Sequence, residues 1–173
     1  MSNYPKIIII TGDINSGKTS TIKKLVNFSK EPIAGIISEG IFINNEKVGY
    51  KIIDIVTQKE ELLISTTPIK TDIKLGRFYF SLTGLEFGQN ILFNIKNEKI
   101  VIIDELGFLE LNKKGFFKPI KYLLKNFTGK LVLVIRYFLI QDITRLFNIE
   151  QFLILDIRTE DFSKIFNTIF SDF

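Results

Sequence analysis

The sequence predicts an α/β fold with a mostly parallel sheet and helices on both of its faces. Apolar runs of strand length, such as Ile7–Ile10 and Ile100–Ile103, alternate along the chain with segments of helical periodicity. This alternation indicates crossovers that place helices over a parallel sheet. The two runs are apolar at every position, as in strands that are covered on both faces. The first run leads through a glycine-rich turn directly into a helix, which is the connection of a strand–helix unit.

The glycine-rich turn is the most informative stretch of the chain. Residues Gly12–Thr19 read GDINSGKT and match the phosphate-binding pattern G-x-x-x-x-G-K-[ST]. The two glycines permit backbone angles and a close approach that a Cβ would prevent, so that successive N–H groups turn toward phosphate. Lys18 is expected to neutralise the β- and γ-phosphates. Thr19 is expected to offer its hydroxyl to Mg²⁺ at the positive end of the following helix.

The context of this pattern favours a nucleotide site over an ordinary glycine-rich turn. A buried strand precedes it, and Ile22, Leu25 and Val26 follow at helical spacing on one face. The sequence therefore predicts a P-loop between the first strand and the first helix.

The residues between the first helix and position 80 predict a β insertion. Two apolar segments flank an asparagine-rich turn over 44–47, which is the pattern of a β-hairpin. Residues 36–80 are too few to bury a core of their own, so we expect one domain over residues 1–173 that contains them. In chain order, the expected elements are a helix that ends near 27–30, strands over 32–38, 41–43, 48–55 and 61–64, and a loop over 65–75.

The second half of the chain continues the alternation of strands and helices. Thr83 and Glu86 have the spacing of a capping box, so Thr83 is the predicted N-cap of a helix that runs to about 94–96. The remaining expected elements are a strand over 99–103, a helix over 116–125, a strand over 131–135, a helix over 140–147, a strand over 152–155 and a helix from about 160.

Composition excludes several classes of chemistry. The 173 residues include no cysteine and no histidine, which excludes disulfides, thiolate chemistry, Cys/His zinc sites and imidazole bases. The net charge is +4, but the 23 basic residues are scattered, so no nucleic-acid partner is expected. The first residues do not resemble a signal peptide, and the longest apolar run, 131–140, is shorter than the roughly 20 residues that span a bilayer. We therefore expect a cytoplasmic protein without a membrane partner.

Two adjacent carboxylates follow the predicted strand over 99–103. In a parallel α/β sheet the ligand lies at the carboxyl ends of the strands, so Asp104 and Glu105 are expected to lie beside Thr19. Asp104 is the predicted Mg²⁺ ligand, because this small, hard cation prefers carboxylate and water oxygens. Glu105 is the predicted catalytic base, because a second carboxylate there can orient and polarise a water. The structural alternatives are a turn-capping Asp104 and a solvated Glu105.

Two arginines are candidates for contact with the γ-phosphate. Arg136 ends the predicted strand over 131–135, where a cation can stabilise charge on the phosphate. Arg77 could do so from the insertion, and either arginine could instead form a surface ion pair. The predicted catalytic residues are Glu105, Lys18 and Arg136, and the predicted metal ligands are Thr19 and Asp104. The predicted nucleotide-binding residues are Gly12, Asp13, Ile14, Asn15, Ser16, Gly17, Lys18, Thr19, Ser20 and Arg77.

With these residues the chain resembles the small P-loop nucleoside-triphosphatase family of thermophiles, known in animals as the cancer-related nucleoside-triphosphatase family. The most specific match is Ile103–Leu111, which reads IDELGFLEL, where the family usually has Asp-Glu-Ile-Gly-Lys-Met-Glu-Leu. Phe108 and Leu109 replace the Lys and Met of that pattern, and with Arg136 they make the chain more similar to a bacterial branch. Three further stretches carry the resemblance, namely Gly35, Val48–Tyr50 and Gly76–Phe78. It implies slow, Mg²⁺-dependent hydrolysis of several nucleoside triphosphates.

The sequence thus predicts a RecA-like P-loop domain that hydrolyses ATP, GTP and other nucleoside triphosphates to diphosphates and phosphate, with Mg²⁺ as cofactor. Two alternatives stay open, and a nucleic-acid-stimulated ATPase ranks below both. A kinase could use the same loop, with residues 36–80 covering a nucleotide or small-molecule acceptor, although Glu105 favours water. A nucleotide-dependent switch could act on a protein partner that the sequence does not identify. Because the loop binds phosphates, little discrimination among nucleobases is expected.

Overall fold

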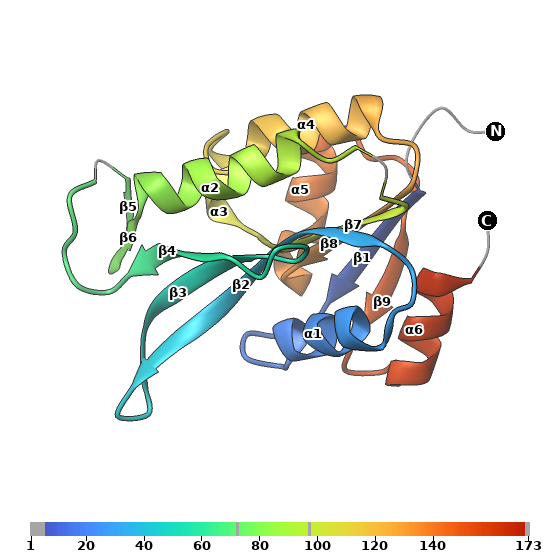
Figure 1. Ribbon diagram of the computed structural model, residues 1–173, viewed down its shortest axis with the longest axis horizontal. Helices are drawn as coiled ribbons and strands as arrows, with labels where there is room; N and C mark the ends of the chain where they lie inside the picture. Colours follow the sequence, from blue (N-terminus) through green and yellow to red (C-terminus); the bar gives the residue numbers. More distant parts are fainter. Residues whose placement is uncertain (1–5, 72, 97, 172–173) are drawn as a thin grey trace.

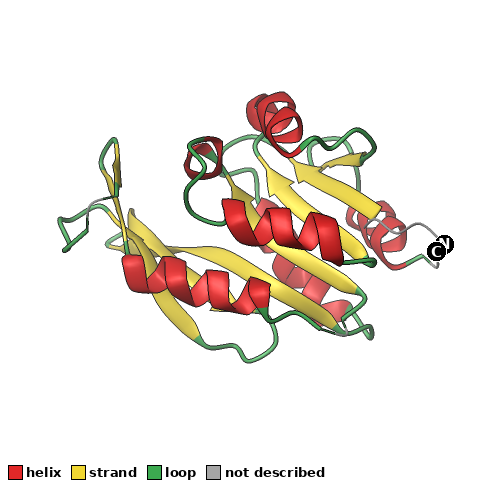
Figure 2. Cartoon of the chain, turned by 90° about the horizontal axis from the view of Figure 1, so that it is seen from above, coloured by secondary structure: helices red, strands yellow, loops and turns green. Residues whose placement is uncertain are grey.

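A nine-stranded sheet with helices on both faces forms the centre of the computed structural model, which describes residues 6–71, 73–96 and 98–171 (Figures 1 and 2). The strand order is β5-β6-β4-β3-β2-β7-β8-β1-β9. The strands are β1 (Lys6–Thr11), β2 (Ile33–Ile43), β3 (Glu46–Asp54), β4 (Glu60–Ser65), β5 (Lys74–Leu75), β6 (Phe78–Phe80), β7 (Ile100–Leu106), β8 (Lys130–Ile135) and β9 (Leu153–Asp156). The helices are α1 (Lys18–Phe28), α2 (Leu82–Phe93), α3 (Phe108–Leu111), α4 (Phe117–Asn126), α5 (Ile140–Phe147) and α6 (Phe162–Phe170).

The sheet is mixed, whereas the sequence predicted a mostly parallel one. One half of the sheet is parallel and consists of strands β2, β7, β8, β1 and β9. Strands β3, β4, β6 and β5 pair in antiparallel fashion. The cause is the connection length, because parallel neighbours need a long crossover while short turns join antiparallel ones. Among the residues described between β2 and β6, no helix is present that could serve as a crossover.

Strand β2 belongs to both halves of the sheet. Its first residues, Ile33–Ile36, pair with β7, and Ile36–Ile43 pair with β3. The two segments predicted over 32–38 and 41–43 are therefore one strand of 11 residues. The predicted hairpin is confirmed, and its turn consists of Asn44 and Asn45, whose φ angles are 49° and 64°. Asparagine tolerates this left-handed region, and a two-residue turn of this kind matches the twist of the strands.

Helix α2 begins earlier than predicted. Its N-cap is Ser81, whose hydroxyl accepts a hydrogen bond from Gly84 N at 3.2 Å. Thr83 lies inside the first turn, with its hydroxyl 2.9 Å from Ser81 Oγ. Ser81 is the cap because β6 ends at Phe80 and leaves Ser81 extended, which is the conformation of an N-cap.

The remaining predicted elements after position 98 lie within a few residues of the observed ones, and α5 has the predicted bounds. Strand β7 is longer than predicted and includes Asp104 and Glu105. The sequence did not predict β5, β6 or α3, because elements of two to four residues carry no measurable periodicity.

Two apolar clusters cover the two faces of the sheet and explain the run of four isoleucines in β1. Ile7 and Ile9 pack toward α2, α3, α4 and α5, while Ile8 and Ile10 pack toward α1 and α6. Because strand side chains alternate between faces, a strand that is buried on both sides is apolar throughout. Within the described residues, no helix combines the length and the apolar character that crossing a bilayer requires.

Candidate functional site

The loop that connects β1 to α1 lies at the carboxyl end of the parallel strands (Figure 1). Gly12, Asn15 and Gly17 have φ angles of 156°, 59° and 95°. A Cβ at Gly12 would lie 2.7 Å from Ser16 Oγ and 2.8 Å from a side-chain carbon of Ile157, so this position requires glycine. Gly17 is the left-handed N-cap of α1. The free N–H groups of the first turn of α1 therefore face the loop, where they can bind an anion.

Lys18 is a nearly buried cation inside this loop. Its side chain is only 5% exposed, and its Nζ donates a hydrogen bond to the Asp13 carbonyl oxygen at 2.7 Å. The same Nζ lies 3.6 Å from Glu105 Oε2. A buried ammonium group needs such partners, because burial removes its hydration. The loop thus holds a positive charge in its interior, where it can bind an anion.

Glu105 connects the loop to Arg136. Its Oε1 accepts a hydrogen bond from Arg136 Nε at 2.6 Å, while its Oε2 faces Lys18. Asp104 and Leu106 of β7 pair with consecutive residues of β8, so Glu105 is the extra residue of a bulge. A bulge of this kind changes the direction of a side chain. The three predicted catalytic residues therefore lie together, with Glu105 in contact with both Lys18 and Arg136. Arg136 does form an ion pair, but its partner is Glu105 of the predicted site.

Asp104 is fully buried, and neither of its carboxylate oxygens accepts a hydrogen bond of normal geometry. Burial is the main cause that raises the pKa of Asp104 to about 7, and Glu105 raises it further, whereas the Thr19 hydroxyl and Lys18 act in the opposite direction. The Ser38 hydroxyl fixes the backbone by donating to the Asp104 carbonyl oxygen at 2.7 Å. A buried carboxylate without partners is costly unless a cation binds it.

The groups around Asp104 fit a magnesium ion. Mg²⁺ takes carboxylate and hydroxyl oxygens, and the Thr19 hydroxyl lies close enough to Asp104 to affect its pKa. Among the described residues there is no cluster of three or more His, Cys, Asp or Glu side chains that could hold a metal ion. An ion at Asp104 would therefore complete its shell from water and phosphate oxygens, which is the usual mode for Mg²⁺.

Arg77 does not join this site. It lies in the turn between β5 and β6, at the edge of the sheet that is far from β1 (Figure 1). Its guanidinium group lies over the ring of Phe78, 5.2 Å from the centroid. The other predicted nucleotide-binding residues lie in the loop or at the start of α1, and the exposed ones are Asp13, Ile14, Asn15, Ser16 and Ser20.

Lys47 and Arg158 contact the loop although the sequence did not single them out. Lys47 of β3 donates a hydrogen bond to Asn15 Oδ1 at 2.9 Å. Arg158, which follows β9, binds Asp13 Oδ1 at 3.1 Å. Each therefore holds one exposed side chain of the loop. No motif marks Arg158, and the only signal near Lys47 was the adjacent Val48–Tyr50.

Glu110 is a second buried carboxyl group, located just beyond β7. Its Oε2 accepts a hydrogen bond from Gly107 N at 2.8 Å, and its Oε1 accepts one from Phe116 N at 3.0 Å. Burial raises the pKa of Glu110 to about 7, although these two hydrogen bonds oppose the shift. Glu110 thus ties together the two ends of the segment that follows Glu105, which is a structural role.

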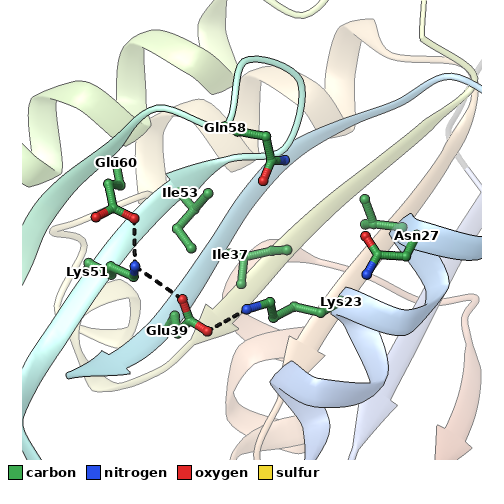
Figure 3. Close-up of a pocket in the computed structure, with 9 residues that line it drawn as sticks. Lys23, Asn27, Ile37, Glu39, Lys51, Ile53, Gln58 and Glu60 are labelled. Atoms are coloured by element: carbon green, nitrogen blue, oxygen red, sulfur yellow. Dashed lines mark hydrogen bonds and ion pairs between the residues drawn. The ribbon is translucent and has the colours of Figure 1, made fainter. Parts of the chain in front are cut away.

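A cavity of about 210 Å³ lies between α1 and the strands β2 and β3 (Figure 3). Its lining includes an alternating network of charges, in which Lys23 lies 2.5 Å from Glu39, and Lys51 lies 3.4 Å from Glu39 and 2.6 Å from Glu60. Lys23 is one helical turn beyond Thr19 on α1, so one lining residue of the cavity lies on the helix that follows the loop.

Comparison with known proteins identifies a family match. A family model described as NTPase matches residues 7–170. The nucleoside-triphosphatase THEP1 of Thermotoga sp. (strain RQ2) is 33% identical over 111 residues, which is 63% of this chain and 62% of that protein. The nucleoside-triphosphatase THEP1 of Methanocaldococcus jannaschii is 32% identical over 124 residues, which is 69% of this chain and 72% of that protein. The match thus covers less than two thirds of the Thermotoga relative.

Two solved structures have a similar fold. The crystal structure of THEP1 from Aquifex aeolicus superposes with a TM-score of 0.74 at 24% identity, over 95% of this chain and 97% of that one. The solution structure of a human cancer-related nucleoside triphosphatase has a TM-score of 0.72 at 18% identity, over 95% of both chains. At these identities the two structures support the fold alone.

Proposed function

The chain belongs to the NTPase family, and from this membership we propose that it hydrolyses nucleoside triphosphates to diphosphates and phosphate. The observation that carries the proposal is the meeting of Lys18, Glu105 and Arg136 at the loop between β1 and α1. Two cations there can neutralise phosphate charge, and a carboxylate beside them can act on a water.

We assign the chain to the RecA-like P-loop class as a single domain over residues 1–173, with residues 36–80 as an insertion. The continuity of the sheet supports this assignment, because β2 pairs with β7 of the parallel half and with β3 of the insertion. Strand β8 lies between β1 and β7. Its last residues therefore reach the gap between the phosphate loop and the two carboxylates.

The bound triphosphate is proposed to compete with Glu105 for its two cations. The β- and γ-phosphates together carry more negative charge than one carboxylate, so Lys18 and Arg136 move toward them when the nucleotide binds. Glu105 then loses its ion pairs, and its oxygens become available to accept a proton from a water near the γ-phosphate. Binding of the nucleotide in this way frees the carboxylate that acts on the water.

Asp104 and Thr19 are the proposed ligands of Mg²⁺. When bound, the ion neutralises charge on the phosphates during transfer. Asp104 would gain a partner for carboxylate oxygens that otherwise accept no hydrogen bond. Thr19, at the start of α1, would offer its hydroxyl to the same ion.

The test is phosphate release from ATP, GTP, CTP and UTP in the presence of Mg²⁺, with and without EDTA. We expect release from all four nucleotides, with rates within about tenfold of one another, since the loop binds phosphates. EDTA should abolish release. Lys18→Ala should abolish it as well while leaving the fold intact, as judged by circular dichroism and thermal unfolding. A folded Lys18→Ala variant with near-native activity would refute the proposed site.

The cavity in Figure 3 favours a second candidate, the transfer of phosphate to a small polar acceptor. One of its lining residues, Lys23, lies one helical turn beyond Thr19 on α1, and a ligand with amino and acidic groups could exchange partners with the ion pairs that line it. Hydrolysis and phosphate transfer differ in whether consumption of the nucleotide requires an added acceptor. Release that is independent of any added acceptor supports the hydrolase, whereas nucleotide consumption that begins only when a nucleoside, nucleotide or amino acid is added supports the kinase.

A further inference from the structure

Tyr137 and Arg158 form an exposed pair of planar groups. The guanidinium carbon of Arg158 lies 4.7 Å from the centroid of the Tyr137 ring. Tyr137 is 58% exposed, and the Arg158 side chain is 36% exposed. A tyrosine with this exposure contributes little to the core, because apolar burial is what makes aromatic side chains stabilising.

The pair lies over the end of β1, where the phosphate loop begins. Strands β8 and β9 flank β1 on its two sides. Tyr137 follows β8 and Arg158 follows β9, so their contact crosses the carboxyl end of β1. Arg158 also binds Asp13 of the loop through Nη1, at 3.1 Å.

The guanidinium group of Arg158 is held in place rather than free. Asp156 accepts hydrogen bonds from Arg158 Nε at 2.9 Å and from Nη2 at 2.6 Å. These bonds run in the plane of the guanidinium group and leave its faces available, one of them for Tyr137. A preformed flat surface binds a planar ligand with little loss of side-chain entropy.

The strand order gives the direction in which a bound nucleotide extends. Glu105 of β7 lies on one side of β1 in the sheet, and Arg158, after β9, lies on the other. A triphosphate whose γ-phosphate is near Glu105 and whose phosphates follow the loop therefore directs its base toward the side of β9. That side carries the planar pair.

We propose that Tyr137 and Arg158 bind the base of the nucleotide by stacking. The inference rests on the proposed triphosphate site and adds to it the place of the base. Every nucleobase has a π face that can stack on an aromatic ring or a guanidinium plane, so such a site tolerates all bases. This agrees with the small rate differences expected among the four nucleotides.

A second cation–aromatic cluster on the hairpin is the alternative place for the base. Lys47 lies over the rings of Phe42 and Tyr50, 5.4 Å and 4.9 Å from their centroids, and Lys47 also contacts Asn15 of the loop. There the ammonium group of Lys47 lies over both rings on which a base would have to stack, and lysine itself offers no planar face. The hairpin also lies on the same side of β1 as Glu105, where the γ-phosphate is placed.

The experiment compares a ligand that has a base with one that has none. Equilibrium binding of a non-hydrolysable ATP analogue and of inorganic tripolyphosphate, both with Mg²⁺, is measured for the native protein and for variants. Tyr137→Ala should weaken binding of the analogue about tenfold, because loss of one base–aromatic stack has an effect of this order. Its binding of tripolyphosphate should stay within about twofold of native, and Tyr137→Phe should restore binding of the analogue.

The matched control is Tyr122→Ala, which removes a similarly exposed tyrosine of α4 that pairs with Phe93 away from the loop. It should bind both ligands like the native protein. Equal weakening of both ligands by Tyr137→Ala, or no weakening of either, would overturn the stacking site while leaving the proposed hydrolysis intact. A selective loss of analogue binding in Phe42→Ala, but not in Tyr137→Ala, would place the base on the hairpin and overturn it as well. Absence of nucleotide binding by the native protein would overturn both proposals.

Discussion

Arg136 Nε lies 2.6 Å from Glu105 Oε1, so the residue after β8 neutralises the second carboxylate of β7. Lys18 faces the other oxygen of the same carboxylate at 3.6 Å. Both oxygens of this carboxylate therefore have a cationic partner. The three side chains therefore form one unit, and their contributions to hydrolysis should be coupled.

Glu105→Gln should slow hydrolysis while sparing the binding of Mg²⁺·nucleotide. The amide keeps the size of the side chain and one acceptor oxygen but is a far weaker base, and loss of a general base typically costs about 10² to 10⁴ in rate. The measurements are single-turnover hydrolysis and equilibrium binding of the same nucleotide. Native-like hydrolysis by the folded variant would show that Glu105 is not the base.

Asp104→Asn should instead raise the Mg²⁺ concentration that half-maximal hydrolysis requires, because a neutral amide is a poorer partner for this cation. It should also raise the melting temperature at pH 8 in EDTA, since it removes a fully buried carboxylate whose oxygens accept no hydrogen bond. Metal titrations and thermal unfolding measure the two effects. An unchanged Mg²⁺ dependence would argue against Asp104 as a ligand.

Arg136→Ala should lower the rate of the chemical step more than it lowers nucleotide affinity, since a cation beside the γ-phosphate best matches the charge of the transition state. The double variant with Glu105→Gln should lose less than the sum of the two single effects on the barrier, because the residues contact each other. Single-turnover rates and dissociation constants for the four proteins test both points. Equal effects on rate and binding would assign Arg136 a structural role.

The free energy of unfolding of the metal-free protein should decline as pH rises from about 5 to 7.5. Burial raises the pKa of Glu110 from 4.5 to about 7. Between these two pH values, Glu110 is therefore protonated in the folded protein and ionised in the unfolded chain. The contribution of this group is therefore largest below pH 4.5 and falls as pH rises through the folded pKa of about 7, by up to roughly 3 kcal/mol. Urea unfolding across this pH range measures the decline.

Glu110→Gln does not titrate and should show a smaller decline. The variant should also be less stable than the native protein. The two carboxyl oxygens of Glu110 accept hydrogen bonds from the backbone N–H groups of Gly107 and Phe116, and in glutamine an NH₂ group, which cannot accept, replaces one of these oxygens. Glu86→Gln, at an exposed carboxylate of α2, is the matched control. A pH profile identical to that of the native protein would show that Glu110 does not carry the dependence.

Local chemistry determined the features that the sequence predicted correctly. The loop between β1 and α1 follows from two glycines at a fixed spacing, and the φ angle of 156° at Gly12 shows why one of them is needed. The hairpin follows from Asn44 and Asn45, which tolerate the left-handed region. The buried strands follow from apolar runs that serve both faces of the sheet. In each case the cause lies within a few neighbouring residues.

The tertiary structure alone decided which distant residues meet. Glu105 and Arg136 are 31 positions apart, and Asp13 and Arg158 are 145 apart, and their contacts depend on strands β7, β8, β1 and β9 lying side by side in that order. The position of Arg77 at the far edge of the sheet has the same origin. Strand order results from competition among all possible pairings and from the packing of helices over them, which no local pattern encodes. The chain itself therefore specifies the phosphate loop, whereas the arrangement of the sheet selects the charges that surround it.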